Sequence, residues 1–499
     1  MKMFLKIDFA SLLKHHCLVF VFAGLWGIMR FAYAEIGDDA MITFTYARNL
    51  VEGNGFVFNP GEVVYGTTTP LWGLFAALGL KIGVAPWTWT LCWDVIFGGV
   101  VLWRMREILG AVDAAVFFPL AAALVVYGSA YTLRHAGMET GCYNALIWSS
   151  LAALVCRRAP WRAIFWAGWA MALRPDGIAI LAVACVYAVV RLWGERDWRP
   201  WATSAAPLAI PGVFALALLL YFGTLIPQSV VAKSYVTHRA SHFHQFWYLL
   251  VRGIIWNMGV LNVSALFAVF GFGLWIRDRT LRPVALFVGA YIGFFVVGRA
   301  PAFPWYYTPL VLVGCLYFVI GGLAVARYLV ERCGARMPNP RVAFPVLYAC
   351  LVLAALLPQL PVMTTFNRGA FLVMGPELHH HRYREIAEAI NRESKGAARM
   401  AGLEIGYFGY FLEGHVFDTC GLVTPASIEA MKTGTHPLLV ADSEWYVVPT
   451  WSSDLSRDEA EIADAAGYTL HSKWDWPGGW TYVFRRPVKA VAPPPAPAG

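Results

Sequence analysis

Long apolar runs recur along the first 359 residues of the chain, and shorter polar segments separate them. A lipid bilayer core of about 30 Å requires about 20 mainly apolar residues per helix. The runs that qualify lie near 16–34, 87–105, 112–130, 140–156, 160–173, 177–193, 201–222, 253–275, 282–298, 305–326 and 341–359. The sequence therefore predicts an α-helical polytopic membrane protein with about 11 transmembrane helices.

One further apolar stretch, residues 70–84, is short for a span because it has about 15 residues, holds three glycines and contains Lys81. If this stretch spans the membrane, Arg104 and Arg106 fall outside and every later loop inverts. If it is a surface or re-entrant helix, the loops on one side hold 18 Lys and Arg, against 8 in the opposite short loops. Because basic residues favour the cytoplasmic side, we predict eleven spans, with the N-terminus inside and the C-terminal segment outside.

The character of the chain changes after residue 359. Residues 1–359 carry 27 Lys and Arg against 15 Asp and Glu, whereas residues 360–486 carry 11 against 16 and are almost twice as dense in charge. Helix patterns at 380–394, 425–432 and 456–466 alternate with strand patterns at 400–412, 415–419, 444–450, 468–474 and 479–486. We predict a membrane domain at 1–359 with a long first external loop at 35–86, a small external α/β domain at 360–486, and a disordered Pro/Ala tail at 487–499.

Composition supports the membrane assignment and excludes other classes. Of the 499 residues, 59% are hydrophobic and 14% are charged, against about 25% charged in soluble proteins. Nucleic-acid binding does not explain the net charge of +8, since the excess follows the predicted cytoplasmic loops. Most of the nine cysteines lie inside apolar runs, so no disulfide framework is expected. The N-terminus fits a retained signal anchor better than a cleaved signal peptide.

Two adjacent acids, Asp38 and Asp39, follow the first predicted span and precede an amphipathic helix expected over residues 40–52, which carries Arg48. One interpretation is structural: Asp38 caps this helix and Asp39 complements its dipole. The other interpretation is that a carboxylate just outside the membrane acts as general base on an incoming hydroxyl group. Their position immediately after the first span favours the second interpretation.

A series of short motifs follows in order along most of the chain: DDAMITFTYARNLVEGNGFVFNPGE, YGTTTPLW, GMET, LRPDG, YFGTLIPQSVVAK and IGYFGYFLEGHVFDTCGLVTP. The series resembles a family of GT-C-type membrane glycosyltransferases, which includes arabinofuranosyltransferases of cell-wall arabinan and pilin and related flagellar-motor control proteins. The resemblance implies an inverting enzyme that moves a sugar, with arabinofuranose expected, from a polyprenyl-phosphate donor to an extracytoplasmic glycan or glycoprotein. It also implies a location in the bacterial cytoplasmic (inner) membrane, with a periplasmic C-terminal domain.

The resemblance assigns roles to particular residues. In the family an acid in the first external loop is the base, which maps onto Asp38, with Asp39 second. The departing lipid phosphate is negatively charged, so cations are expected beside it. We expect the substrates to contact these residues: Arg48, Glu139, Arg174, Asp176, Lys233, Arg299, Trp305 and Tyr306.

Structural alternatives stay open for most of these residues. Arg174 is either a phosphate ligand or an interfacial arginine paired with Asp176. Glu139 either lines the active cleft or complements a helix dipole. Trp305 and Tyr306 either stack on substrate or anchor the chain at the membrane surface. Related enzymes often have a lysine where this chain has YGTTTP, so the handling of the phosphate must differ here.

A few remaining features bear on ions and cofactors. Asp94, inside the second predicted span, is either a functional acid or the partner of Arg30. The histidines at 379–381 open a predicted helix and therefore point around different faces, and no CxxC or HExxH motif occurs. We expect no metal and no cofactor beyond the lipid-linked donor.

The main rival function is a transporter or flippase of lipid-linked sugars. Such proteins commonly show internal repeats and broken helices near the bilayer midplane. No convincing repeat relates the two halves of this chain, and its polar residues gather at one predicted face. An assembly partner with a decayed active site is a third alternative, which the intact Asp38–Asp39 pair disfavours.

Overall fold

The computed structural model divides the chain into two compact units. The helical unit comprises Met1–Glu35, Trp87–Leu218 and Arg239–Pro376, and the sheet unit comprises Ile36–Pro86, Leu219–His238 and Glu377–Gly499. The first external loop predicted from the sequence thus belongs to the same unit as the C-terminal segment. The structure describes residues 9–32, 35–112, 114, 118–132, 135–156, 159–236, 279–298, 303–333, 382–450, 455–476 and 479–487.

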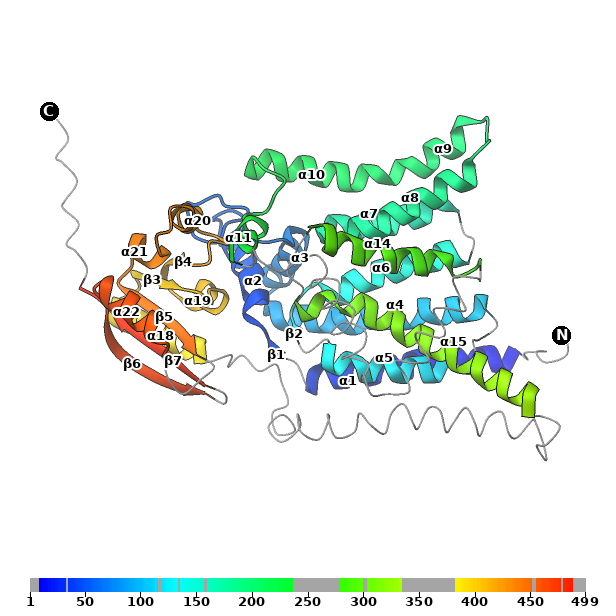
Figure 1. Ribbon diagram of the computed structural model, residues 1–499, viewed down its shortest axis with the longest axis horizontal. Coiled ribbons are helices and arrows are strands. Elements are labelled where there is room, and N and C mark those ends of the chain that lie inside the picture. The colour runs from blue at the N-terminus through cyan, green and yellow to red at the C-terminus, as the bar shows by residue number, and fades with distance from the viewer. Residues whose placement is uncertain are drawn as a thin grey trace. The chain divides into compact units, whose positions relative to one another are not determined.

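Apolar helices make up the helical unit (Figure 1). They and two short 3-10 turns are α1 (Phe9–Ala32), α4 (Pro86–Ala111), α5 (Phe118–Thr132), α6 (Thr140–Val155), α7 (Pro160–Leu173), η2 (Pro175–Gly177), α8 (Ile178–Leu192), α14 (Arg282–Gly298), η5 (Pro304–Tyr306) and α15 (Thr308–Cys333). A further helical run, α9 (Trp198–Ala205), η3 (Ala206–Leu208) and α10 (Ala209–Phe222), continues into the sheet unit. Each predicted span on described residues overlaps one of these helices, except that the span at 201–222 covers the run α9, η3 and α10. The predicted spans at 253–275 and 341–359 lie outside the described residues.

Two stretches of the described residues are both long and apolar enough to cross a membrane: Pro175–Leu192 and Trp198–Phe222. Several other helices are apolar but shorter. Helix α10 is part of the second stretch, and none of its residues is buried. This is expected for side chains that face lipid. These helices agree with a membrane protein, and the count of eleven spans stays a prediction.

The doubtful apolar stretch forms a helix of its own, α3 (Pro70–Lys81), with proline at its first position. It has 12 residues, or about 18 Å at 1.5 Å per residue, which is short of a bilayer core. Residues 82–85 separate it from α4, and Gly83 in this break has a φ of 81°, a conformation that favours glycine. The stretch is therefore not a straight continuation of the next helix.

The sheet unit contains a five-stranded sheet (Figure 1), with the order β4-β3-β5-β7-β6. The strands are β3 (Ala398–Gly402), β4 (Gly414–Asp418), β5 (Trp445–Thr450), β6 (Thr469–Trp476) and β7 (Gly479–Arg485). β3 is parallel to both β4 and β5, and β7 is antiparallel to β5 and β6. The helices of the unit are α2 (Asp38–Val51), α3, α11 (Gln228–Val236), α18 (Tyr383–Ser394), α19 (Gly406–Phe411), α20 (Pro425–Lys432), α21 (Pro437–Val440) and α22 (Arg457–Ala465).

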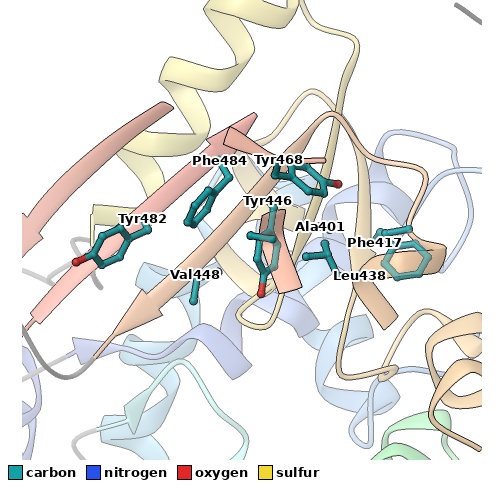
Figure 2. Packing of buried hydrophobic residues seen from close by; sticks show 10 residues of the cluster. Ala401, Phe417, Leu438, Tyr446, Val448, Tyr468, Tyr482 and Phe484 are labelled. Carbon is teal, nitrogen blue, oxygen red and sulfur yellow. The ribbon is translucent and has the colours of Figure 1, made fainter. Parts of the chain in front are cut away.

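Aromatic side chains form the core on one face of this sheet, as Figure 2 shows. Tyr446 of β5 lies between Phe484 of β7 and Tyr468, with ring centroids 6.0 Å and 5.8 Å away. Ala463 of α22 and Leu438 of α21 complete the cluster. Burying large rings contributes most of the apolar area that a small α/β fold needs.

One predicted element of this segment is wrong. The sequence predicts a single strand over residues 400–412, but β3 ends at Gly402 and residues 406–411 form helix α19. The repeated Gly and aromatic residues of GYFGYF resemble a strand, yet the glycines serve close packing. A Cβ atom on Gly409 would lie 2.3 Å from the Phe58 ring, so tertiary packing overrides local propensity here.

Candidate functional site

Asp38 opens helix α2, but its side chain does not cap that helix. The N-cap residue is Gly37, and it makes no side-chain cap bond. The Asp38 carboxylate instead accepts hydrogen bonds from the backbone N–H groups of Gly406 (2.8 Å) and Tyr407 (2.9 Å), one at each oxygen. The predicted role of Asp38 as a cap of its own helix is therefore wrong, because Asp38 satisfies the free N–H groups at the start of α19.

This contact requires glycine at position 406. A Cβ atom added there would lie 1.9 Å from the main-chain oxygen of Asp38, closer than any two such atoms approach. The Tyr407 hydroxyl also donates to the carbonyl of Ile36 at 2.7 Å. The IGYFG motif thus fixes the carboxylate of Asp38, which is 6% exposed.

Glu404 joins Asp38 from the turn between β3 and α19. The negative charges of Asp38 and Asp39 act on its carboxyl group. Burial, together with the negative charges of Asp38 and Asp39, raises the pKa of Glu404 well above its ordinary value. Glu404 is not among the residues predicted from the sequence, although its place immediately before the IGYFG motif is a signal that could have identified it.

Asp418 reaches the same edge of the sheet from the end of β4. The strands β3 and β4 run parallel, so the turns that follow them meet at one edge. The buried Asp418 carboxylate accepts hydrogen bonds from the backbone N–H groups of Cys420 (2.8 Å), Leu422 and Val423 (3.1 Å). Burial raises the pKa of Asp418 to about 6, although the N–H bonds oppose this rise. We call Asp38, Asp39, Glu404 and Asp418 the acidic cluster.

Lys233 of α11 brings a positive charge to this cluster. The charge of Lys233 lowers the pKa of the Cys420 thiol, while Asp418, Glu404 and Asp39 raise it. Burial is the largest effect, and the pKa of Cys420 is raised to about 12, so the thiol is not a nucleophile at neutral pH. The charge of Lys233 thus reaches Cys420, two residues after Asp418.

Arg48 has a packing role in the structure. Its guanidinium group donates to the carbonyl of Tyr410, lies 5.5 Å from the centre of the Tyr410 ring, and is 3.6 Å from the Glu52 carboxylate. These contacts join α2 to α19. Arg48 thus holds in place the helix whose N-terminus binds Asp38.

Polar side chains also connect the rest of the segment 35–86 to other parts of the sheet unit. Asn59 donates to the carbonyl of Val416 at 3.0 Å and accepts its N–H at 3.2 Å, which pairs the loop with strand β4. The hydroxyl groups of Thr43, Thr67 and Thr69 lie 3.3–3.4 Å from one another. The threonines of YGTTTP therefore contact one another inside the sheet unit.

A second polar cluster lies within the helical unit, where Arg174 follows α7. Its guanidinium group binds Asp176 through two hydrogen bonds (2.9 Å and 3.1 Å) and Glu139 through a third (3.0 Å). The rings of Tyr143 and Tyr306 lie 4.6 Å and 4.7 Å from its central carbon. All three charged residues are nearly inaccessible to solvent. The predicted pairing of Arg174 with Asp176 is present, and Glu139 adds a second acid.

Neighbouring residues complete this second cluster. The Tyr291 hydroxyl donates to Asp176 at 2.9 Å, a contact that the sequence did not predict. Trp305 stacks on Phe303 with ring centroids 4.9 Å apart. Arg299 lies outside the described residues. We call Glu139, Arg174 and Asp176 the arginine cluster.

The predicted ion pair between Arg30 and Asp94 is confirmed. The Arg30 Nε donates to Asp94 at 2.8 Å, and both side chains are buried. A Cβ atom on Gly141 would lie 1.7 Å from the Asp94 carboxylate, so the glycine after GMET makes room for it. A structural ion pair accounts for the acid inside the second predicted span.

The described residues contain no group of three or more His, Cys, Asp or Glu residues arranged to hold a metal ion. The histidines at 379–381 lie outside the part of the chain that the structure describes. The expectation that the protein uses neither metal nor cofactor stays a prediction.

Comparison with known proteins identifies relatives along part of the sequence. No protein-family model matches the chain. It is 26% identical over 255 residues to a terminal β-(1→2)-arabinofuranosyltransferase of Mycobacterium tuberculosis, a match that covers 46% of this chain and 37% of that protein. The chain therefore matches little more than a third of the length of this arabinofuranosyltransferase.

The fold has close structural counterparts. ArnT from Cupriavidus metallidurans bound to undecaprenyl phosphate matches with a TM-score of 0.56 and 16% identity, over 96% of this chain and 98% of that one. The archaeal oligosaccharyltransferase AglB from Archaeoglobus fulgidus, in complex with an inhibitory peptide and a dolichol-phosphate, matches with a TM-score of 0.55 and 10% identity, over 95% and 74%. As the ordered motifs predicted, the chain has the fold of the GT-C-type polyprenyl-phosphate-dependent membrane glycosyltransferases.

Proposed function

We propose that the protein is a glycosyltransferase that moves a sugar from a polyprenyl-phosphate donor to an acceptor outside the cytoplasmic membrane. The partial sequence match to an arabinofuranosyltransferase supports sugar transfer, with arabinofuranose as the sugar. The structural counterparts bound to undecaprenyl phosphate and dolichol-phosphate support a lipid-linked donor. The acceptor is an extracytoplasmic glycan or glycoprotein, and the protein resides in the bacterial inner membrane with its sheet unit in the periplasm.

The observation that carries this proposal is the fixed carboxylate of Asp38. Two backbone N–H groups hold its two oxygens at 2.8 Å and 2.9 Å. A carboxylate so oriented is suited to general-base catalysis. Asp39 is the adjacent acid and is more exposed than Asp38.

The reaction follows from these groups. Asp38 removes the proton of an acceptor hydroxyl as the hydroxyl oxygen attacks the anomeric carbon. The bond from that carbon to the phosphate oxygen breaks, and the lipid phosphate departs with the electron pair. Lys233 supplies positive charge for the departing phosphate. The geometry of attack opposite to the leaving group inverts the anomeric configuration.

A transfer assay tests whether Asp38 is the general base. Purified protein in detergent is incubated with a radiolabelled polyprenyl-phosphate arabinofuranose and an arabinan acceptor, and label in the acceptor is counted. We expect Asp38→Asn to reduce transfer about 10²- to 10⁴-fold, because the amide cannot take the proton. Asp442→Asn is the matched control, since Asp442 is an exposed acid of the same unit.

Two outcomes would contradict the proposal. Full transfer by Asp38→Asn and Asp39→Asn would remove the base assignment. Passage of labelled lipid across vesicles without transfer would favour a flippase. Because Asp38 also binds the start of α19, a melting curve accompanies each variant and separates loss of chemistry from loss of fold.

A further inference from the structure

Ser229 of α11 is a buried residue whose hydroxyl group is not satisfied within the protein. The residue is 3% exposed, and its Oγ atom has no hydrogen-bond partner among the described residues. A buried hydroxyl group without a partner costs stability, so each such group in a native protein calls for an explanation. The surroundings of Ser229 indicate which kind of partner its hydroxyl group fits.

The position of Ser229 on its helix favours an anion. Ser229 is the second residue of α11, and the first turn of a helix carries a partial positive charge from its N–H groups. Lys233 follows four residues later, so it lies on the same face of α11 as Ser229. Ala232 on this side is fully buried, whereas Val230 is 46% exposed. A hydroxyl donor and an ammonium group one turn apart, at the start of a helix, are typical of a phosphate site.

Hydrogen bonds and close packing tie the start of α11 to the segment that follows β4. The N–H group of Gln228 donates to the carbonyl of Tyr65 at 2.6 Å. A Cβ atom on the next residue, Gly66, would lie 2.5 Å from the Val423 side chain, and the Val423 N–H group binds the Asp418 carboxylate at 3.1 Å. Helix α11 also packs against α20, which follows this segment. The first turn of α11 is therefore connected to the acidic cluster through neighbouring main-chain segments.

Exposed apolar side chains flank this turn on the other side. They end α10, connect it to α11 and continue on the outer face of α11, and they are 44–78% exposed: Leu219, Leu220, Leu225, Ile226 and Val230. In a membrane protein such side chains face lipid, and the polar groups beside them lie at the depth of the lipid headgroups. Ser229 and Lys233 are thus placed where the phosphate of a membrane lipid lies.

We propose that Ser229 and Lys233 bind the phosphate group of the polyprenyl-phosphate donor, with the Ser229 hydroxyl donating a hydrogen bond to a phosphate oxygen. The identity of the lipid rests on the proposed function. When the bond between the anomeric carbon and the phosphate oxygen breaks, the phosphate gains a negative charge, and both contacts become stronger. Ser229 keeps its proton throughout, so it stabilises the leaving group without reacting.

The first test requires no sugar transfer. Binding of undecaprenyl phosphate to the purified protein in detergent is measured together with melting curves in the presence and absence of this lipid. Without lipid, Ser229→Ala should melt at the wild-type temperature or above, because it removes a hydroxyl group that has no partner. The Kd for undecaprenyl phosphate should rise about 10-fold, and the lipid should raise the melting temperature less than in the wild type.

Two further variants control this test. Ser229→Thr keeps the hydroxyl group and should retain most of the affinity. Thr469→Ala removes an exposed hydroxyl group of β6 and should bind like the wild type. A wild-type Kd in Ser229→Ala, with or without a lower melting temperature, would overturn the proposal. Equal affinity of the wild type for phosphatidic acid, with the same loss in Ser229→Ala, would make this a general headgroup site and overturn its assignment to the donor.

A transfer assay then separates this inference from the proposed function. We expect Ser229→Ala to lower kcat/KM for the lipid-linked donor about 10-fold, and Ser229→Thr to restore most of it. Binding of undecaprenyl phosphate that depends on Ser229, in a protein that transfers no sugar, would support the phosphate site and contradict the proposed function. Transfer by Ser229→Ala with wild-type kcat/KM would support the proposed function and rule out the role of Ser229.

Discussion

The arginine cluster of the helical unit and the acidic cluster of the sheet unit both bury carboxyl groups, but they compensate them differently. In the arginine cluster, Glu139 and Asp176 both bind the guanidinium group of Arg174 at 2.9–3.1 Å. In the acidic cluster, the carboxylates of Asp38 and Asp418 accept hydrogen bonds from backbone N–H groups. The acids of one site are paired with a cation, whereas those of the other accept hydrogen bonds from neutral backbone groups.

This difference separates a structural role from a chemical one. A carboxylate paired with arginine has a fixed charge and little reason to accept a proton. A buried carboxyl group held by neutral N–H groups can instead keep a raised pKa, as burial raises the pKa of Asp418 to about 6, and can exchange a proton near neutral pH. The comparison therefore favours the acidic cluster as the place of the proposed chemistry and a structural role for Arg174.

The largest effect is the loss of stability expected for Arg174→Met. Removing the guanidinium group leaves Glu139 and Asp176 buried without a counter-charge, which costs about 3–5 kcal/mol. The melting temperature in detergent should therefore fall steeply, whereas Arg191→Met, which removes an exposed arginine of α8, should leave it unchanged. A stable Arg174→Met that binds the lipid-linked donor poorly would instead make Arg174 a phosphate ligand and remove the contrast between the clusters.

Much of the helical unit was predictable from the sequence because its helices satisfy their own backbone groups and bury apolar side chains against one another or lipid. Long apolar runs therefore mark these helices directly. The Arg30–Asp94 pair was predictable for the same reason: two opposite charges inside apolar runs need each other. Asp176 was also an accessible partner for Arg174, since only one residue separates them.

The acidic cluster was less predictable because its bonds join distant parts of the chain. The N–H groups that bind Asp38 are 368 and 369 residues away, and the local pattern offered its own helix as a nearer partner. Helix α19 was mistaken for a strand, which hid the donors as well. Glu404 acquires its altered pKa only when the first loop and the turn after β3 come together.

The next largest effect is the loss of thermal stability expected for Asp418→Asn. This variant tests whether backbone N–H groups alone hold an acid in the cluster. The amide group turns an N–H toward donors from Cys420 or Val423, which costs about 1–3 kcal/mol. Burial raises the pKa of Asp418 from 3.8 to about 6, so its contribution to stability is present below about pH 4 and is lost as the pH rises through 6. The deficit of the variant should therefore be largest near pH 4 and smaller at pH 8, as measured by thermal unfolding. A deficit that is independent of pH would mean that Asp418 does not titrate in this range.

The smallest effect is the loss of kcat/KM expected for Lys233→Met. This variant tests whether a cation near the acidic cluster has a role in sugar transfer. Lys233 is half-buried and acts on Cys420 at the edge of the cluster. If it supplies charge to the departing phosphate, its loss should lower kcat/KM for the lipid-linked donor about 10-fold and weaken the salt dependence of transfer. Lys233→Arg should restore most of the rate, and Lys432→Met, at an exposed lysine of α20, should have no effect. Wild-type kcat/KM in Lys233→Met would assign the phosphate to another cation and confine the chemistry of the cluster to its carboxyl groups.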